Sequence, residues 1–189
     1  MSRDLFPAEL ESVRRGMYPG AVLSSDRRRR YSLTRYIGPG ARIALFWMVN
    51  PSFADEHRND NTIAKCTEFA RLWGCGWLSV VNLFSWISTN PLGLYLAADP
   101  VGPENAEHCI RAARAAHESD GPVICAWGAH GAWRDQNLSA LRWLKRERIP
   151  AACLGTTAEG HPRHPGRLAY ATPLEPFAGR APGVAAWRA

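Results

Sequence analysis

Three continuous apolar segments constrain the fold more strongly than any other feature of this sequence. They are IALFWMV at residues 43–49, LSVVNLF at 78–84 and PVICAW at 122–127. Their lengths and their β-branched residues predict strands that are buried on both faces, because a strand with one solvent-exposed face alternates apolar and polar residues. A shorter candidate strand, AACLG, follows at 151–155.

Helical periodicity lies between these segments. Apolar residues recur at helical spacing over residues 62–73, 105–118 and 135–148. Strands that alternate with helices predict an α/β fold of three layers (αβα), in which helices cover a central four-stranded, mainly parallel sheet. Residues 31–37 alternate apolar and polar side chains, and we expect them to add an N-terminal edge strand.

The length of the chain is typical of one domain. A chain of 189 residues is long enough to bury one α/β core, and division into several domains becomes common only at larger sizes. We expect residues 1–30 to form a partly flexible N-terminal extension with an arginine-rich end. Residues 31–189 are then the single α/β domain.

The charge of the chain indicates an anionic partner. Its formal net charge is +6, and an excess of arginine and lysine favours binding to DNA or to a nucleotide-like small molecule. The densest basic cluster is the run from Arg27 to Arg30. Such a run is either a solvated face or a phosphate contact, and the sequence leaves both interpretations open.

Several classes of protein are not expected. No apolar stretch approaches the roughly 20 residues that span a bilayer, and the N-terminus lacks the apolar core of a secretory signal, so we expect a cytoplasmic monomer without a membrane partner. The five cysteines and six histidines show no paired ligand spacing. We therefore expect reduced, mostly buried thiols and no metal or other cofactor.

Short polar segments follow each predicted strand. In open parallel sheets, ligands bind just beyond the carboxyl ends of the strands, so these segments are expected to converge on one site. They are Asn50-Pro51-Ser52, the stretch from Asn82 to Thr89, Trp127-Gly128, and GHPRHPGR at residues 160–167.

The order of these motifs resembles the uracil-DNA glycosylase superfamily. The chain from about residue 31 to residue 174 is also similar to a bacterial family of unknown function with the pattern N-P-S, N-L-F, W-G and P-R-H-P. The first resemblance implies a small parallel sheet flanked by helices and cleavage of an N-glycosidic bond. Two positions depart from the glycosylase pattern, because Ser52 replaces a glycine or aromatic residue and Gly166 replaces a serine.

Three residues are predicted to be catalytic. Breaking an N-glycosidic bond develops negative charge on the departing base and positive charge on the sugar. His164 can donate a hydrogen bond to the base, and Asn50 can position water without acting as a base. Asp55 is the candidate for a stronger, carboxylate base, whereas Asp60 is expected to cap a helix.

Base recognition is assigned to three residues of the first two polar segments. Phe53 is the best candidate to stack on an extruded base, and Phe84 is the next. By the resemblance, Asn82 would read the Watson–Crick edge of that base. Either orientation of its amide is possible, so the identity of the base stays open.

The remaining candidates concern the DNA backbone. Arg163 and Arg167 flank the His-Pro pair and can hold phosphates beside a flipped nucleotide. Ser52 and Gly166 are placed at the phosphate contacts by the resemblance. The leading hypothesis is therefore a DNA glycosylase-like enzyme that releases a damaged or modified base. The alternatives are an N-glycosidase acting on a free nucleoside or nucleotide and a nucleic-acid-binding protein without turnover.

Overall fold

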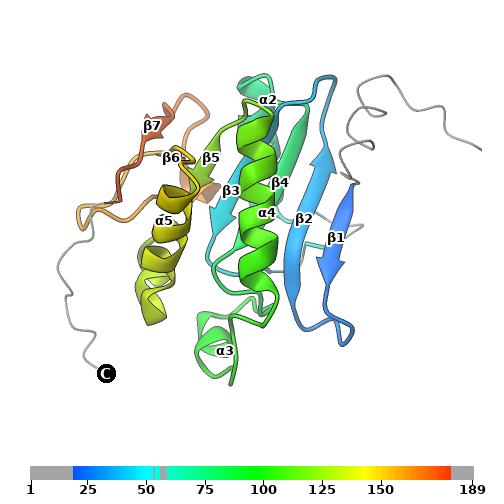
Figure 1. Ribbon diagram of the computed structural model, residues 1–189, viewed down its shortest axis with the longest axis vertical. Coiled ribbons are helices and arrows are strands. Elements are labelled where there is room, and N and C mark those ends of the chain that lie inside the picture. Colours follow the sequence, from blue (N-terminus) through cyan, green and yellow to red (C-terminus); the bar gives the residue numbers. More distant parts are fainter. Residues whose placement is uncertain (1–18, 53, 56–58, 180–189) are drawn as a thin grey trace, which may run out of the picture.

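The computed structural model describes residues 19–52, 54–55 and 59–179, and these residues form one sheet with helices on both faces (Figure 1). In this part of the chain the sheet has seven strands in the order β1-β2-β4-β3-β5-β6-β7. The strands are β1 (Gly20–Leu23), β2 (Arg30–Tyr36), β3 (Ile43–Met48), β4 (Trp77–Asn82), β5 (Val123–Cys125), β6 (Ala151–Cys153) and β7 (Glu175–Pro176).

The helices connect successive strands of the sheet. They are α2 (Asn61–Leu72), α3 (Pro91–Tyr95), α4 (Asn105–Glu118) and α5 (Gln136–Arg146), with 3-10 turns η1 (Ala129–Asp135) and η2 (Pro165–Arg167). In Figure 1, α4 and α5 lie in front of the sheet and α2 lies behind it. The predicted three-layer α/β arrangement is therefore present.

The predicted strand count was too small. The centre of the sheet is parallel as expected, because β3 pairs in parallel with β4 and β5, and β5 with β6. Antiparallel β2 and β1 extend it beyond β4, and antiparallel β7 extends it beyond β6. The edge strand predicted at 31–37 is β2, but β1 pairs with its outer side and forms the actual edge of the sheet. Strands as short as β1 and β7 are too brief for a period of two to be recognised.

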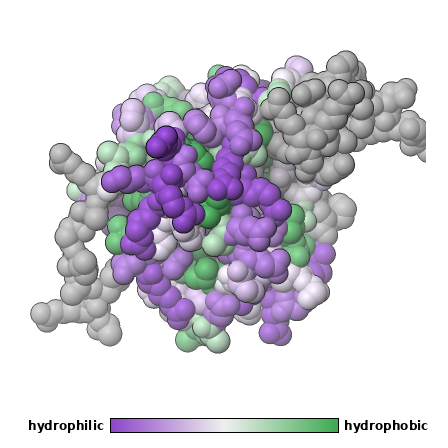
Figure 2. Space-filling model, viewed as in Figure 1, coloured by the Kyte–Doolittle hydropathy of each residue, from purple (hydrophilic) through white to green (hydrophobic). Residues whose placement is uncertain are grey.

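Burial of β3 on both faces organises the two halves of the core. All six of its residues are buried. Phe46 and its neighbours on one face pack with α2, whereas Leu45 and Trp47 on the other face pack with α4 and α5. Figure 2 shows that the outer surface over α4 and α5 is largely hydrophilic, as expected for helices with one buried stripe.

Polar side chains bond backbone groups at the starts of α2 and α4. Asp60 caps α2, because its Oδ1 accepts a hydrogen bond from the backbone N–H of Ile63 at 2.8 Å. Asn105 at the start of α4 is buried and donates from Nδ2 to the carbonyl oxygens of Asn82 and Leu83 at 2.9 and 3.0 Å. The Asn105 bonds fix α4 relative to the carboxyl end of β4, whereas the Asp60 bond closes the first turn of α2.

The exclusions drawn from the sequence can be compared with the structure at two points. All five cysteines are buried and free, as predicted. Among the described helices, none combines the length and the apolar character that crossing a membrane requires.

Removing the side chain of Phe46 is expected to destabilise the fold strongly. Phe46 has no exposed surface and sits at the centre of the face that α2 covers. We expect Phe46→Ala to lower the free energy of unfolding by about 3–5 kcal/mol, measured by urea denaturation. Leu72→Ala is the control, because Leu72 is 57% exposed, and it should change stability by less than about 0.5 kcal/mol. Equal effects of the two substitutions would contradict this packing.

Candidate functional site

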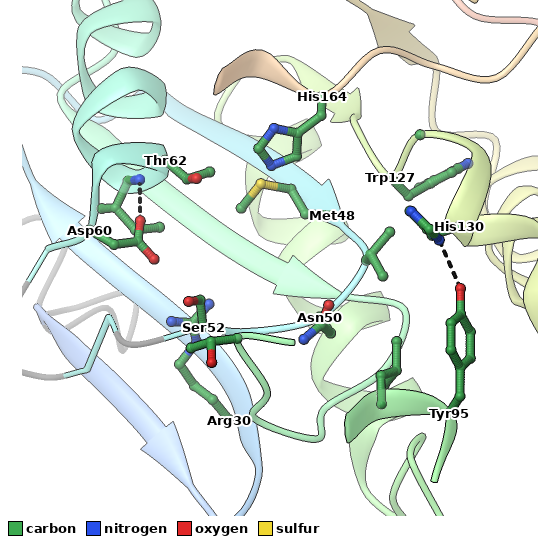
Figure 3. A pocket seen from close by; sticks show the side chains of 15 residues that line it. Arg30, Met48, Asn50, Ser52, Asp60, Thr62, Tyr95, Trp127, His130 and His164 are labelled. Carbon is green, nitrogen blue, oxygen red and sulfur yellow. Dashed lines mark hydrogen bonds between the residues drawn. The ribbon is translucent and has the colours of Figure 1, made fainter. Parts of the chain in front are cut away.

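A cavity of about 260 Å³ opens at the carboxyl edge of the parallel strands. Its walls come from the start of β2, the segment after β3, the start of α2, the loop after β4, α3, the segment after β5, and the loop before η2 (Figure 3). The lining residues are Arg30, Met48, Val49, Asn50, Ser52, Asp60, Thr62, Ile63, Thr89, Leu94, Tyr95, Trp127, Gly128, His130 and His164. Asn50, Ser52 and His164 are thus brought together, as expected from the sequence.

The side-chain amide of Asn50 has one defined orientation. Its Nδ2 donates to the carbonyl oxygens of Pro51 at 3.0 Å and Ser88 at 2.7 Å. Because both partners are acceptors, the NH₂ group must face them and Oδ1 must face away. In Figure 3 this oxygen is turned toward the side of the cavity where Met48 and His164 lie. Asn50 therefore presents a hydrogen-bond acceptor to the cavity.

The imidazole of His164 presents a hydrogen-bond donor, whereas Asn50 presents an acceptor. Its Nδ1 accepts a hydrogen bond from the backbone N–H of Gly166 at 3.2 Å, which caps the short turn η2. In the neutral ring this contact assigns the proton to Nε2. The Pro165-Gly166 turn thus holds a ring that presents an N–H donor on its far side. Gly166 acts on the histidine through its own backbone N–H.

The pKa of His164 is lowered from its ordinary value of 6.5. Partial withdrawal of the ring from water is the main cause, and the Asp60 carboxylate acts in the opposite direction. The ring is therefore neutral at pH 7. A neutral imidazole with a fixed tautomer donates a hydrogen bond without giving up a proton.

Asp60 is the carboxylate that lines the cavity, and the sequence analysis assigned it only the capping role. One of its oxygens does cap α2, as predicted. The sequence analysis proposed Asp55 as the catalytic carboxylate, but Asp55 does not line the cavity. Its backbone carbonyl oxygen accepts a hydrogen bond from Arg35. The sequence did contain a signal that Asp60 could reach the cavity. Asp60 is the N-cap of a helix that begins at the carboxyl edge of the sheet, and a capping carboxylate keeps one oxygen for other contacts.

Arg30 is a second lining residue that the sequence analysis did not single out. It is only 2% exposed, and it donates from Nη1 to the carbonyl oxygen of Ala54 at 2.6 Å and from Nη2 to Oδ1 of Asn82 at 3.3 Å. Burial lowers the pKa of Arg30 to about 10, so the guanidinium remains charged at pH 7. Of the four consecutive arginines, it alone lies within a strand.

Two residues predicted to contact the base lie elsewhere. Asn82 is 1% exposed, and its side chain accepts the bond from Arg30 instead of lining the cavity. Phe84 is fully buried and packs against Trp133 with ring centroids 5.0 Å apart. The pairing with the β3 segment continues past Asn82, because the Phe84 N–H bonds the Val49 carbonyl at 2.9 Å. This continuation directs Phe84 into the core, where it cannot stack on a ligand.

Other aromatic groups border the cavity instead. Trp127 follows β5, and Tyr95 ends α3, where its hydroxyl lies 2.7 Å from Nδ1 of His130 (Figure 3). Phe53, the predicted stacking residue, lies outside the described residues. Trp127 and Tyr95 are therefore the described aromatic side chains that can contact a ring in the cavity.

A second depression of about 370 Å³ adjoins the first. It shares Gly128 and His164 with the cavity and is also bordered by Arg163 and Arg167, both of which are exposed. The two arginines thus lie beside the cavity, on the side of His164. This is the position that the sequence analysis assigned to phosphate contacts.

Comparison with known proteins identifies a family for this chain. The family described as "Protein of unknown function (DUF1643)" has a model that matches residues 30–166. The chain belongs to this family. The match begins at Arg30 and ends just after His164, so the DUF1643 segment contains every residue that lines the cavity. Neither the curated proteins nor the solved structures include a significant match.

Within residues 19–52, 54–55 and 59–179, no group of three or more histidine, cysteine, aspartate or glutamate side chains could hold a metal ion.

The titration of His164 tests the site of this DUF1643 protein directly. We expect the NMR titration midpoint of the His164 ring to lie below 6.5, because burial disfavours the charged form. The unfolded chain then takes up the proton first, so the free energy of unfolding should fall as the pH drops from 6.5 through the folded-state pKa.

His164→Asn is the matched variant for this experiment. An asparagine oxygen can still accept the Gly166 N–H, but it does not titrate. The variant should therefore keep its fold at pH 7 and lose the His164 part of the pH dependence. The comparison must be made between variants, because burial also lowers the pKa of His108. A midpoint above 6.5 would contradict the assigned environment.

Proposed function

We propose that this protein is a DNA glycosylase-like hydrolase that releases a damaged or modified base from DNA by cleaving its N-glycosidic bond. One observation carries the proposal: Asn50 and His164, one an oriented acceptor and the other an oriented donor, line the same cavity. Cleavage of this bond needs both groups, one for the attacking water and one for the departing base.

The two groups match the charges of the reaction. The C1′–N bond breaks with its electron pair moving to the base, and the oxygen of water bonds to C1′. A proton from that water ends on the released base. The Nε2–H of His164 stabilises the negative charge that develops on the base, and Oδ1 of Asn50 orients the water.

Asp60 is a carboxylate in the cavity and can accept a proton. An amide such as Asn50 cannot take a proton at neutral pH, whereas a carboxylate can. Asp60 also adds negative charge to a site where the sugar becomes positive. We therefore assign it the role for which the sequence analysis suggested Asp55.

The size of the cavity and the charges beside it support DNA as the substrate. A volume of about 260 Å³ lies just below the range of roughly 300–1,000 Å³ typical of pockets for drug-sized ligands, so it suits a single ring system. A base can enter such a site only after it leaves the helical stack. Arg163 and Arg167 lie beside the cavity where flanking phosphates would pass.

The resemblance to uracil-DNA glycosylases agrees with this proposal. That superfamily has a parallel sheet with helices around it, and the parallel strands β4, β3, β5 and β6 with α2, α4 and α5 are compatible with it. Asn50 and His164 are the residues that the resemblance assigns to water and base, and both face one cavity here.

The decisive experiment is release of bases from a panel of oligonucleotides. Single- and double-stranded DNA carrying uracil, hypoxanthine, xanthine or a modified pyrimidine is incubated with the protein, and abasic sites are scored by alkaline cleavage. Asn50→Ala and His164→Ala should each lower the rate about 100-fold or more, because each removes a group that acts in the transition state.

His117→Ala is the control for this assay, because His117 is an exposed residue of α4 away from the cavity. It should leave the rate unchanged. If no oligonucleotide yields abasic sites, or if both active-site variants retain full activity while folded, the proposed function is wrong. Release from a free nucleoside alone would instead favour the small-molecule alternative.

The salt dependence of DNA binding tests the role of the two arginines. Each phosphate contact contributes about one unit to the slope of log K against log salt concentration. Arg163→Gln and Arg167→Gln should each reduce the slope by about one, measured by fluorescence anisotropy with a labelled oligonucleotide. Arg142→Gln on α5 is the control and should not change it. Unchanged slopes in all three variants would remove the proposed DNA contact.

A further inference from the structure

The four consecutive arginines have different surroundings. Arg27 and Arg28 are exposed. Arg29 forms an ion pair with Asp99 at 3.2 Å and lies over the ring of Trp86. Arg30 is 2% exposed and lines the cavity. Of the four, only Arg30 is buried without a carboxylate in contact, so its environment needs a separate explanation.

The hydrogen bonds of Arg30 leave part of its guanidinium unused. The group has five N–H donors, and its bonds go to two uncharged acceptors, the Ala54 carbonyl and the Asn82 side chain. Its Nε–H is buried without a partner, so the donors left for a ligand are the second N–H groups of Nη1 and Nη2. Among the described residues, no carboxylate lies within 4 Å of it, although Asp60 and Asp55 favour its charge from farther away and Arg35 opposes it.

A buried cation with spare donors is costly for a protein to keep. A buried charge without a contacting counter-ion loses its hydration and regains little in return. Arginine cannot avoid that cost by losing its proton at neutral pH. A protein can keep such a buried cation where a ligand supplies the missing negative charge. Arg30 lines the cavity, where a ligand can reach it.

We infer that the cavity accepts a planar ring bearing a carboxylate, and that the Arg30 guanidinium binds this carboxylate. The match is geometric as well as electrostatic, since a guanidinium offers parallel N–H donors and a carboxylate offers two parallel acceptors. Uracil alternates acceptor, donor and acceptor along its pairing edge and does not fit this fork. The ring is the scissile base, so the identity of the substrate as a nucleobase rests on the proposed function.

This inference defines a substrate class, a pyrimidine base carrying a carboxylate. Pairing with Arg30 would neutralise the carboxylate and make it more electron-withdrawing. A more electron-withdrawing substituent makes the base a better leaving group. One contact would therefore both select the base and assist its departure, which suits a site whose water is oriented by an amide.

Isothermal titration calorimetry with the full chain tests the binding. The probes are uracil-5-carboxylate and uracil-6-carboxylate, with uracil-5-carboxamide as the neutral analogue of similar shape. At least one carboxylate should bind about tenfold or more tightly than the carboxamide, because hydrogen bonds between charged groups are the stronger ones. Arg30→Gln should remove this preference, and Arg28→Gln, in the same arginine run, should retain it.

Asn82→Asp keeps the test valid if Arg30→Gln does not fold. Asn82 Oδ1 already lies 3.3 Å from Nη2 of Arg30, and its Nδ2 has no partner, so the substitution loses no hydrogen bond. The new carboxylate would neutralise Arg30 in place. We expect a folded protein that no longer prefers the carboxylate ligands.

The outcomes separate this inference from the proposed function. If neither carboxylate binds the wild-type protein better than the carboxamide, or if Asn82→Asp keeps the preference, Arg30 is not an anion site. Carboxylate binding that depends on Arg30, together with no abasic sites from any oligonucleotide, would support the anion site and reject the glycosylase. Abasic sites without any preference for the carboxylate ligands would support the glycosylase and reject the anion site.

Discussion

Burial of β3 on both faces is the constraint on which the rest of the structure depends. A strand without a solvent-exposed face needs helices on either side, and these are supplied by α2 on one face and by α4 and α5 on the other. Helical connections make the neighbouring strands parallel, so their carboxyl ends meet at one edge. The polar residues Asn50, Ser52 and His164, which follow strands of the sheet, line the cavity at that edge.

The chemistry of the cavity is then determined by backbone groups. Two carbonyl oxygens decide which way the Asn50 amide points, and one backbone N–H decides which nitrogen of His164 carries the proton. A second backbone donor, at the start of α2, engages one oxygen of Asp60. Side chains held in this way need little reorganisation when a ligand binds, which is the condition for strong electrostatic stabilisation of a transition state.

The sequence was sufficient for the regular core and for placing Asn50 and His164 at the same edge of the sheet, because both follow from periodicity and from where strands end. Helix α4 begins and ends at the predicted residues. The sequence was insufficient for β1 and β7, whose patterns are too short, and for Phe84, which was predicted to stack on a base although strand pairing continues to it and its side chain is buried. Arg30 could not be recognised, because its burial depends on Ala54 and Asn82, which are distant along the chain.

The contact between Asn50 and the Ser88 carbonyl joins the loops that follow β3 and β4. A change in length of either loop would therefore shift the side-chain amide of Asn50. The hairpin at 156–162 is closed by its own hydrogen bonds, such as the 2.8 Å bond from the Thr157 N–H to the His161 carbonyl. Substitutions in this hairpin are therefore easier for the fold to accommodate than changes in the two loops joined by Asn50, because none of residues 156–162 lines the cavity.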